Sequence, residues 1–261
     1  MFRWGNPSVR TWVNRSQKGS LAVEEEAATY GGVARRTILL CALSMLVAII
    51  VEGALWYSFL RPEVILENVQ YWVYGLIGMG VVAVAWLIMH IVILFAPKTA
   101  KVLGPICCFV QGLFLGLTAF VFDLFVPGIS LAALLGTGLV FLLVLLLYKR
   151  MEERIKNSFG RIFIIFLISY LVAQVAMVIA SLAMNDWALF IIEAITSLLF
   201  IGLACFTVMW DIRNIDTLVQ SGVDKAYEWV VAYALTTSLI YLYLQILEFL
   251  FRIATLLKSK K

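Results

Sequence analysis

Residues 204–216 read Ala204-Cys-Phe-Thr-Val-Met-Trp-Asp-Ile-Arg-Asn-Ile-Asp216, which places a cluster of charges where a long apolar segment ends. Further along the chain, Leu242-Tyr-Leu-Gln-Ile-Leu-Glu-Phe249 lies inside a second long apolar segment. Acidic and amide groups at membrane depth cost several kcal/mol unless they face a cavity or a partner. We therefore expect the two segments to form a helical pair whose polar side chains carry the function.

The composition is that of an integral membrane protein. Of 261 residues, 63% are hydrophobic and 14% are charged, and the mean hydropathy is +1.00. A soluble domain is about half apolar and about a quarter charged. The apolar runs are long and continuous rather than alternating, which indicates transmembrane helices. The net charge of +4 does not indicate nucleic-acid binding, because Lys and Arg residues lie mainly at the ends of the apolar segments.

Seven apolar segments are each long enough to cross about 30 Å of hydrocarbon as a helix. They cover residues 37–60, 71–96, 103–126, 129–148, 162–183, 188–210 and 230–257. We expect an all-α membrane protein with an N-terminal tail at 1–36, a seven-helix transmembrane domain at 37–257 and a basic C-terminal end at 258–261. No signal peptide is expected, because a mostly polar tail precedes the first apolar segment.

Lysine and arginine residues predict the orientation. The tail and the connections at 97–102, 149–161 and 211–229 carry most of them. The opposite side has Arg61, Lys258, Lys260 and Lys261. Because positively charged loops stay in the cytoplasm, we expect the N-terminus there.

The charged groups near span ends have an ordinary interpretation. Glu52, Asp123 and Glu193 lie near the outer ends of their predicted spans, where carboxylates can reach water. His90 is the only histidine and lies near the end of the second span. We interpret it as an interfacial side chain with a satisfied hydrogen bond.

The two segments quoted first hold the stronger candidates. Asp211 directly follows Trp210 and is expected to be partly buried, whereas Asp216 is expected on a water-exposed helical extension that ends near Ser221-Gly222. A polar stripe on the last helix is formed by three residues at helical spacing: Gln245, Glu248 and Arg252. Such a stripe faces the bundle or a cavity. The pair of Glu248 and Arg252 has two interpretations, a simple ion pair or a functional group.

The sequence lacks the motifs of an enzyme or of a cofactor site. A single histidine cannot form a multi-histidine zinc site, and no GxSxG, HExxH or glycine-rich phosphate loop occurs. The cysteines lie in apolar segments without metal-ligand spacing: Cys41, Cys107, Cys108 and Cys205. We expect no catalytic residue, no cofactor, no firm metal site and no nucleic-acid partner.

Gly112-Leu-Phe-Leu-Gly116 is a GxxxG motif in the third span. Small residues at this spacing let two helix backbones approach closely. We interpret the motif as packing within the chain rather than as a dimerisation signal.

Several of these stretches resemble the Bax-inhibitor family, in its bacterial YccA-like branch. They are Trp210–Asp216, the link from Gly222 to Trp229, Leu242–Leu247, Gln111–Gly116, Gly128-Ile129, Asn6-Pro7-Ser-Val and the approach from Tyr30 to Arg36. The resemblance implies seven helices with the last one central, and a multi-pass protein of the bacterial plasma membrane. Family members that act as calcium leaks use a pair of carboxylates, on helices six and seven, that share a proton when the pore is closed.

Carried onto this chain, the helix-six carboxylate is Asp211, whereas the helix-seven position is Gln245 and Gln111 stands where relatives often have Glu. An amide can donate a hydrogen bond permanently, as a protonated acid would. We therefore expect a contact between Asp211 and Gln245, with Glu248 as a possible substitute, and weak pH sensitivity. Asp211 and Gln245 are 34 residues apart. They can lie at the same height in the helical pair only if both helices project beyond the membrane or the link between them is a real loop.

Two functions are expected from these features. The first is a cation leak, with Ca²⁺ as the transported ion, gated by the contact between helices six and seven. The candidate pore and gating residues are Asp211, Gln245, Glu248, Asp216, Arg252 and Gln111. The alternative is a non-transporting regulator that binds a membrane protease or another membrane complex through its charged tail. The expected partner in either case is the lipid bilayer, and the sequence leaves the oligomeric state open.

Overall fold

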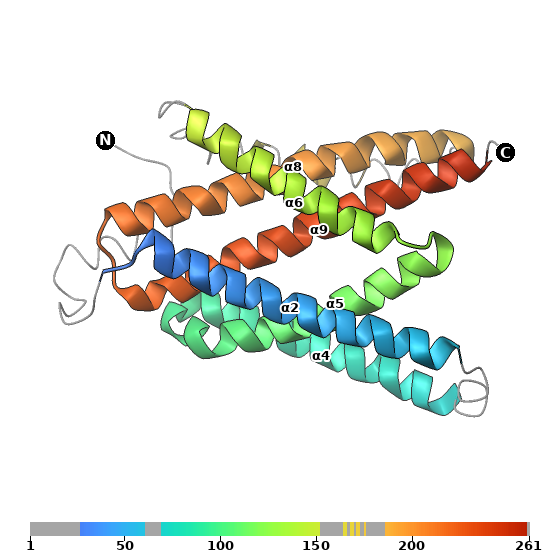
Figure 1. Ribbon diagram of the computed structural model, residues 1–261, viewed down its shortest axis with the longest axis horizontal. Coiled ribbons are helices and arrows are strands. Elements are labelled where there is room, and N and C mark those ends of the chain that lie inside the picture. The colour runs from blue at the N-terminus through green and yellow to red at the C-terminus, as the bar shows by residue number, and fades with distance from the viewer. Residues whose placement is uncertain are drawn as a thin grey trace. The chain divides into compact units, whose positions relative to one another are not determined.

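The computed structural model describes residues 27–60, 69–151 and 186–259, with isolated positions 164, 165, 168, 169, 171, 172 and 175. The side chains of residues 59, 69–79, 186–195, 256, 258 and 259 are outside this description. The described chain is helical (Figure 1). Most of the predicted span at 162–183 lies outside the described residues, although the isolated positions within it are helical. Expectations for residues 1–26, including the tail's role, also lie outside them.

The described helices follow the apolar segments closely. They are α2 (Tyr30–Phe59), α4 (Val69–Phe95), α5 (Ala100–Phe125), α6 (Ile129–Arg150), α8 (Asp186–Gln220) and α9 (Glu228–Ser259), with the short 3-10 helices η1 (Pro97–Thr99) and η2 (Lys225–Tyr227). Within the described residues, five helical stretches have the length and hydropathy of membrane spans. The protein is thus an all-helical, multi-pass membrane protein, and a seventh helix stays a prediction.

Two helices extend beyond their apolar segments. α2 begins at Tyr30, seven residues before the predicted span, with Thr29 as its N-cap. α8 continues to Gln220, ten residues past the predicted end at 210, and Gly222 follows with a positive φ of 60°. That φ suits glycine, which has no Cβ to oppose it. The predicted helical extension ending near Ser221-Gly222 is therefore confirmed.

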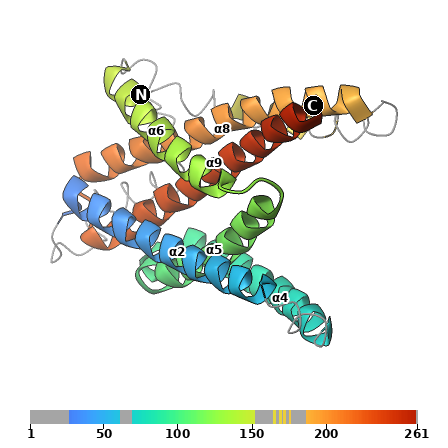
Figure 2. The same ribbon diagram turned by 45° about the vertical axis from the view of Figure 1, so that its right-hand side comes forward.

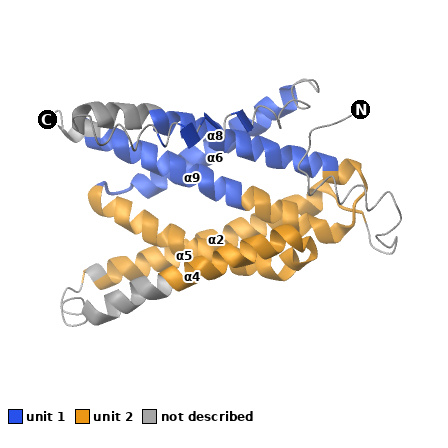
Figure 3. Cartoon of the chain, turned by 180° about the vertical axis from the view of Figure 1, so that it is seen from behind, with its two compact units in different colours: residues 1–12, 126–217, 237–261 blue, residues 13–125, 218–236 orange. Residues whose placement is uncertain are grey.

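The described chain forms two compact units (Figure 3). Unit 1 contains residues 126–217 and 237–261, which include α6, most of α8 and the C-terminal part of α9. In this unit α6, α8 and α9 pack on one another through polar and close apolar contacts. Tyr148 of α6 meets Asp216 of α8, Ser238 of α9 meets Asp211 of α8, and Gly136 of α6 lies against Ile246 of α9.

Unit 2 contains residues 13–125 and 218–236, which include α2, α4, η1, α5, η2 and the start of α9. In this unit α5 contacts both α2 and α4, and the three helices lie side by side in two views (Figures 1 and 2). The GxxxG motif explains the close packing of α5 on α2. A Cβ on Gly112 would lie 2.6 Å from the Ser44 carbonyl oxygen, and one on Gly116 would lie 2.5 Å from the Ala48 carbonyl oxygen. The prediction of packing within the chain is confirmed.

Candidate functional site

Asp211 lies in unit 1, on the part of α8 that continues past the apolar segment. Its side chain is buried, with 8% of its surface exposed. Its Oδ2 atom accepts a hydrogen bond of 2.5 Å from the Ser238 hydroxyl on α9. The partner is thus a neutral hydroxyl rather than a cation. An ionisable group within a membrane helix is expensive to bury, so it marks a candidate functional position.

The contact with Ser238 fixes the register of α8 against α9. The expected partner, Gln245, lies seven residues beyond Ser238, which is a rise of about 10.5 Å along a helix. Because α8 and α9 run antiparallel from the 221–227 link, Gln245 is level with about residue 204 rather than 211. The Gln245 side-chain oxygen is buried without a hydrogen-bond partner among the described residues. The structure therefore gives Asp211 a hydroxyl partner and places the amide two turns away.

Asp216 has a different environment from Asp211. Its Oδ2 atom accepts a hydrogen bond of 2.6 Å from the Tyr148 hydroxyl, at the end of α6. The side chain is half-buried rather than fully water-exposed, which corrects the expectation for this residue. The physical reason is that α6 ends beside the α8 extension and brings a phenol to the carboxylate. Asp211 and Asp216 thus connect α8 to two different helices.

The polar stripe on α9 resolves into two parts. Glu248 and Arg252 form an ion pair one helical turn apart, with both side chains partly exposed. The simple interpretation of these two residues is therefore the one that the structure shows. Such an exposed pair contributes little stability, about 0.3–0.5 kcal/mol. Gln245 is left as the member of the stripe with an unpaired buried oxygen.

Gln111 belongs to unit 2, where it lies on α5 one residue before the first glycine of the GxxxG motif. Its side chain is buried, with 7% exposed. Gly112 and Gly116 pack against α2, so Gln111 sits in a tightly packed part of the helix. The structure describes this residue within its own unit, and its role in a pore stays a prediction.

Glu52 and Asp123 were expected to reach water at the outer ends of their spans, and Asp123 does not. Asp123 of α5 is buried, with 8% exposed, and lies near Glu52 of α2. The close packing at the GxxxG motif brings the two helices together one or two turns before this pair. The interpretation of Asp123 as a solvated carboxylate is therefore wrong.

His90 has the satisfied hydrogen bond that was expected. Its Nδ1 atom lies 2.9 Å from the Tyr233 hydroxyl on α9, and its ring packs beside those of Tyr233 and Trp86. Within the described residues, no group of three or more His, Cys, Asp or Glu side chains is placed to hold a metal ion. The histidine thus connects α4 to α9 in unit 2.

The sequence model of the family described as Bax inhibitor 1 like matches residues 6–255. The chain belongs to the Bax inhibitor 1-like family. Searches of curated proteins and of solved structures gave no match. The family assignment covers nearly the whole chain of this Bax inhibitor 1-like protein, including α8 and α9.

Ser238 and Tyr148 are the site residues that sequence reasoning missed. A serine or a tyrosine is common in transmembrane helices, so neither stands out from its neighbours. One signal could have found Ser238. In a tight hairpin of two antiparallel helices, residues equally far from the turn face each other, and Asp211 and Ser238 are equally far from about position 224. That signal requires knowing that α8 continues to Gln220, which hydropathy does not show.

Proposed function

We propose that this Bax inhibitor 1-like protein is a leak pathway for cations, with Ca²⁺ as the expected ion, and that Asp211 is the acidic group that the ion meets. The observation that carries the proposal is a buried carboxylate whose partner is a serine hydroxyl. A buried cationic partner would neutralise the acid permanently. A hydroxyl leaves it available to a proton or to a metal ion.

Oxygen atoms are the ligands that calcium prefers. Asp211 and Ser238 bring a carboxylate and a hydroxyl together, and the Gln245 side-chain oxygen adds an unpaired acceptor further along α9. A series of oxygen acceptors along one helix pair can bind an ion weakly at several positions. Conduction needs such weak binding, because an ion that is held tightly does not leave.

The amide at Gln245 has a consequence for gating. A second carboxylate near Asp211 would share a proton with it, and the pair would respond to pH. A glutamine does not titrate. We propose that the leak therefore has no proton shared between two carboxylates, and that its dependence on pH comes from Asp211 alone.

Calcium flux into liposomes tests the function. Purified wild-type protein should release or admit Ca²⁺ faster than protein-free liposomes, and Asp211→Asn should reduce that flux at least about tenfold. Ser58→Ala is the control, since Ser58 lies near the C-terminal end of α2 and donates a hydrogen bond to the Ala54 carbonyl of its own helix. Wild-type flux equal to that of protein-free liposomes would refute the leak, and unchanged flux in Asp211→Asn would refute the role of this residue.

The alternative is a regulator that binds a membrane protease or another membrane complex through its tail. The observation that favours it is that the tail is fixed at one point: the Ala28 amide donates a hydrogen bond of 2.8 Å to the Val223 carbonyl. A tail that leaves from a fixed position can present a binding surface. Deleting residues 1–26 should abolish co-purification of the partner and leave any flux unchanged. Co-purification with the tail-deleted protein would contradict this alternative.

A further inference from the structure

The start of α2 lies against the link between α8 and α9, within unit 2. Ala27 forms an isolated antiparallel β-bridge with Asp224. Next to it, the Ala28 amide donates to the Val223 carbonyl at 2.8 Å. Ala28 and Val223 are both buried. Two segments nearly 200 residues apart are therefore joined by backbone as well as by side chains.

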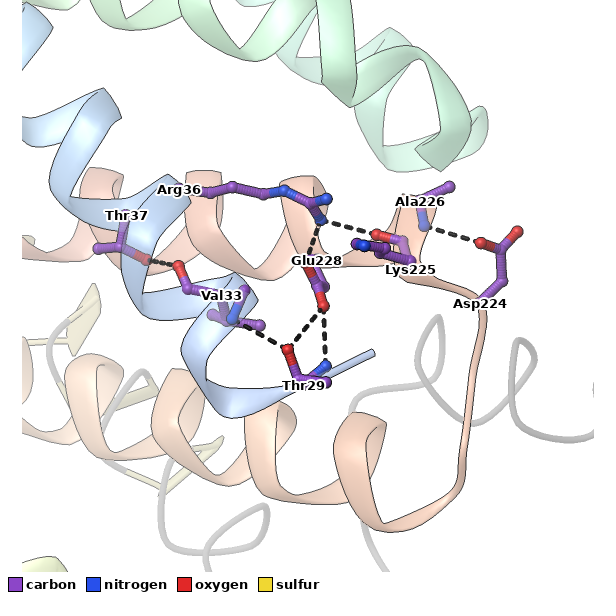
Figure 4. Close-up of polar contacts among 9 residues, drawn as sticks. Thr29, Val33, Arg36, Thr37, Asp224, Lys225, Ala226 and Glu228 are labelled. Carbon is purple, nitrogen blue, oxygen red and sulfur yellow. Dashed lines mark hydrogen bonds and ion pairs between the residues drawn. The ribbon is translucent and has the colours of Figure 1, made fainter. Parts of the chain in front are cut away.

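Glu228 is the centre of this contact (Figure 4). It is the first residue of α9 and has no exposed surface. Its carboxylate accepts a hydrogen bond of 2.8 Å from the Thr29 amide and forms an ion pair of 2.5 Å with the Arg36 guanidinium. Gly32 lies so close that a Cβ at this position would overlap the Glu228 carboxylate. The first turns of α2 thus form a pocket that fits this one acid.

Arg36 connects the same pocket to the rest of the link. Its Nη1 atom donates a hydrogen bond of 2.7 Å to the Lys225 carbonyl (Figure 4). Its guanidinium lies 5.1 Å from the centre of the Trp229 ring. A guanidinium over an indole ring gains a further electrostatic attraction. Arg36 therefore contacts three successive parts of the link and of α9.

Because the contact is built around the buried ion pair of Arg36 and Glu228, its interactions are expected to form and break cooperatively. A buried carboxylate without its cation is strongly disfavoured, so Glu228 cannot stay in the pocket once Arg36 leaves. If Glu228 leaves, the Thr29 amide loses its partner, and if Arg36 leaves, the Lys225 carbonyl loses the hydrogen bond from the guanidinium. The contacts of residues 27–36 with residues 223–229 consequently form and break together.

We propose that residues 27–36 form a clasp that holds the α8–α9 link, and that opening of this clasp releases the first turn of α9 as a conformational control on the protein. α9 is one continuous helix, and Ser238 lies ten residues beyond Glu228, about 15 Å along it. Release of the first turn therefore changes the support of the helix that carries the partner of Asp211. The link to ion flux rests on the proposed function, whereas the clasp itself does not.

Hydrogen–deuterium exchange of the protein in lipid nanodiscs tests the clasp. Arg36→Gln should accelerate exchange of the amides of residues 223–229 by about 100-fold, since losing one partner of a buried ion pair is strongly destabilising. Arg35→Gln is the matched control, because the Arg35 side chain is exposed and its substitution removes the same positive charge. It should leave exchange in the link unchanged. Unchanged exchange in Arg36→Gln, or equal acceleration in Arg35→Gln, would overturn the clasp.

Two further measurements separate a released clasp from a misfolded protein. Exchange of the α5 amides serves as an internal reference and should stay slow in every variant. The double variant Arg36→Gln with Glu228→Gln should accelerate exchange in the link by less than the product of the two single effects, because the two side chains act on each other. A strictly multiplicative effect would overturn the pairing. Altered exchange together with unchanged calcium flux would retain the clasp and refute its control of a leak.

Discussion

Replacement of Gly116 by alanine tests the helix packing that organises unit 2. The new Cβ would lie 2.5 Å from the Ala48 carbonyl oxygen, 2.9 Å from the Val51 Cβ and 3.0 Å from the Ala48 Cα. Two of these atoms belong to the backbone of α2, so no side-chain rotation relieves the overlap. Overpacking of this kind costs about 1–3 kcal/mol. Alanine regains up to about 1 kcal/mol of helix propensity, which leaves a net loss of about 0–2 kcal/mol.

Gly138→Ala is the matched control, because Gly138 is also within a helix and a Cβ there has nothing within 4 Å. It gains the same helix propensity without the overlap. The difference between the two variants should therefore equal the full overpacking cost of about 1–3 kcal/mol. Unfolding in mixed detergent and SDS micelles, followed by tryptophan fluorescence, measures this difference. If Gly116→Ala were as stable as Gly138→Ala, the close approach of α2 and α5 would be refuted.

Three further perturbations follow from contacts in the two units. Tyr148→Phe should destabilise the protein by about 1.5–3 kcal/mol, because it removes a hydrogen bond to the Asp216 carboxylate, and the same unfolding assay measures it; a change below about 0.5 kcal/mol would contradict the contact. Tyr233→Phe should cost about 1–3 kcal/mol in the same assay, because it removes the hydroxyl that pairs with the His90 nitrogen, and a change below about 0.5 kcal/mol would contradict this contact. Ser238→Asp should make calcium flux depend on pH between about 6 and 8 more steeply than in the wild type, because it places a second carboxylate beside Asp211, and equal profiles in the two proteins would contradict this contact.

The sequence was sufficient to predict the apolar core of each described helix. Hydropathy reports which residues prefer lipid, and the predicted spans at 71–96, 103–126 and 129–148 agree closely with α4, α5 and α6. It does not report where a helix stops. Past Trp210, the apolar residues Ile215 and Leu218 return at helical spacing between polar ones, so the helix continues with one buried side. The mean hydropathy falls there while the helical periodicity persists.

The site was predicted in part. Asp211 was singled out from the expense of burying an acid, and its burial is observed. Its partner was not predicted, because register depends on the length of the α8 extension and on the shape of the 221–227 link. If the predicted end of α8 is wrong by a few residues, the α9 residue predicted to face Asp211 is wrong by up to two helical turns. Ser238 and Gln245 differ by that amount.

Glu228 and its partners escaped the sequence argument for a related reason. A glutamate at the start of a helix has an ordinary interpretation, since acids favour helix N-termini. The GxxxG motif, by contrast, was correctly assigned because its physical requirement, close backbone approach, is local to one helix. Contacts between segments that are far apart in the sequence leave no comparable local pattern.

The pairing of Arg36 with Glu228 also has a consequence for synthesis. About 190 residues separate the two partners, and ribosomes add about 5–20 residues per second. Glu228 is therefore synthesised about 10–40 s after Arg36. During that time the first helix is in the membrane with its basic end unpaired and with the surface around Gly32 unfilled. Biogenesis of this protein cannot be completed helix by helix from the N-terminus. α9 is translated after α2 and completes its packing, so a chain that ends before Glu228 leaves the start of α2 without this partner.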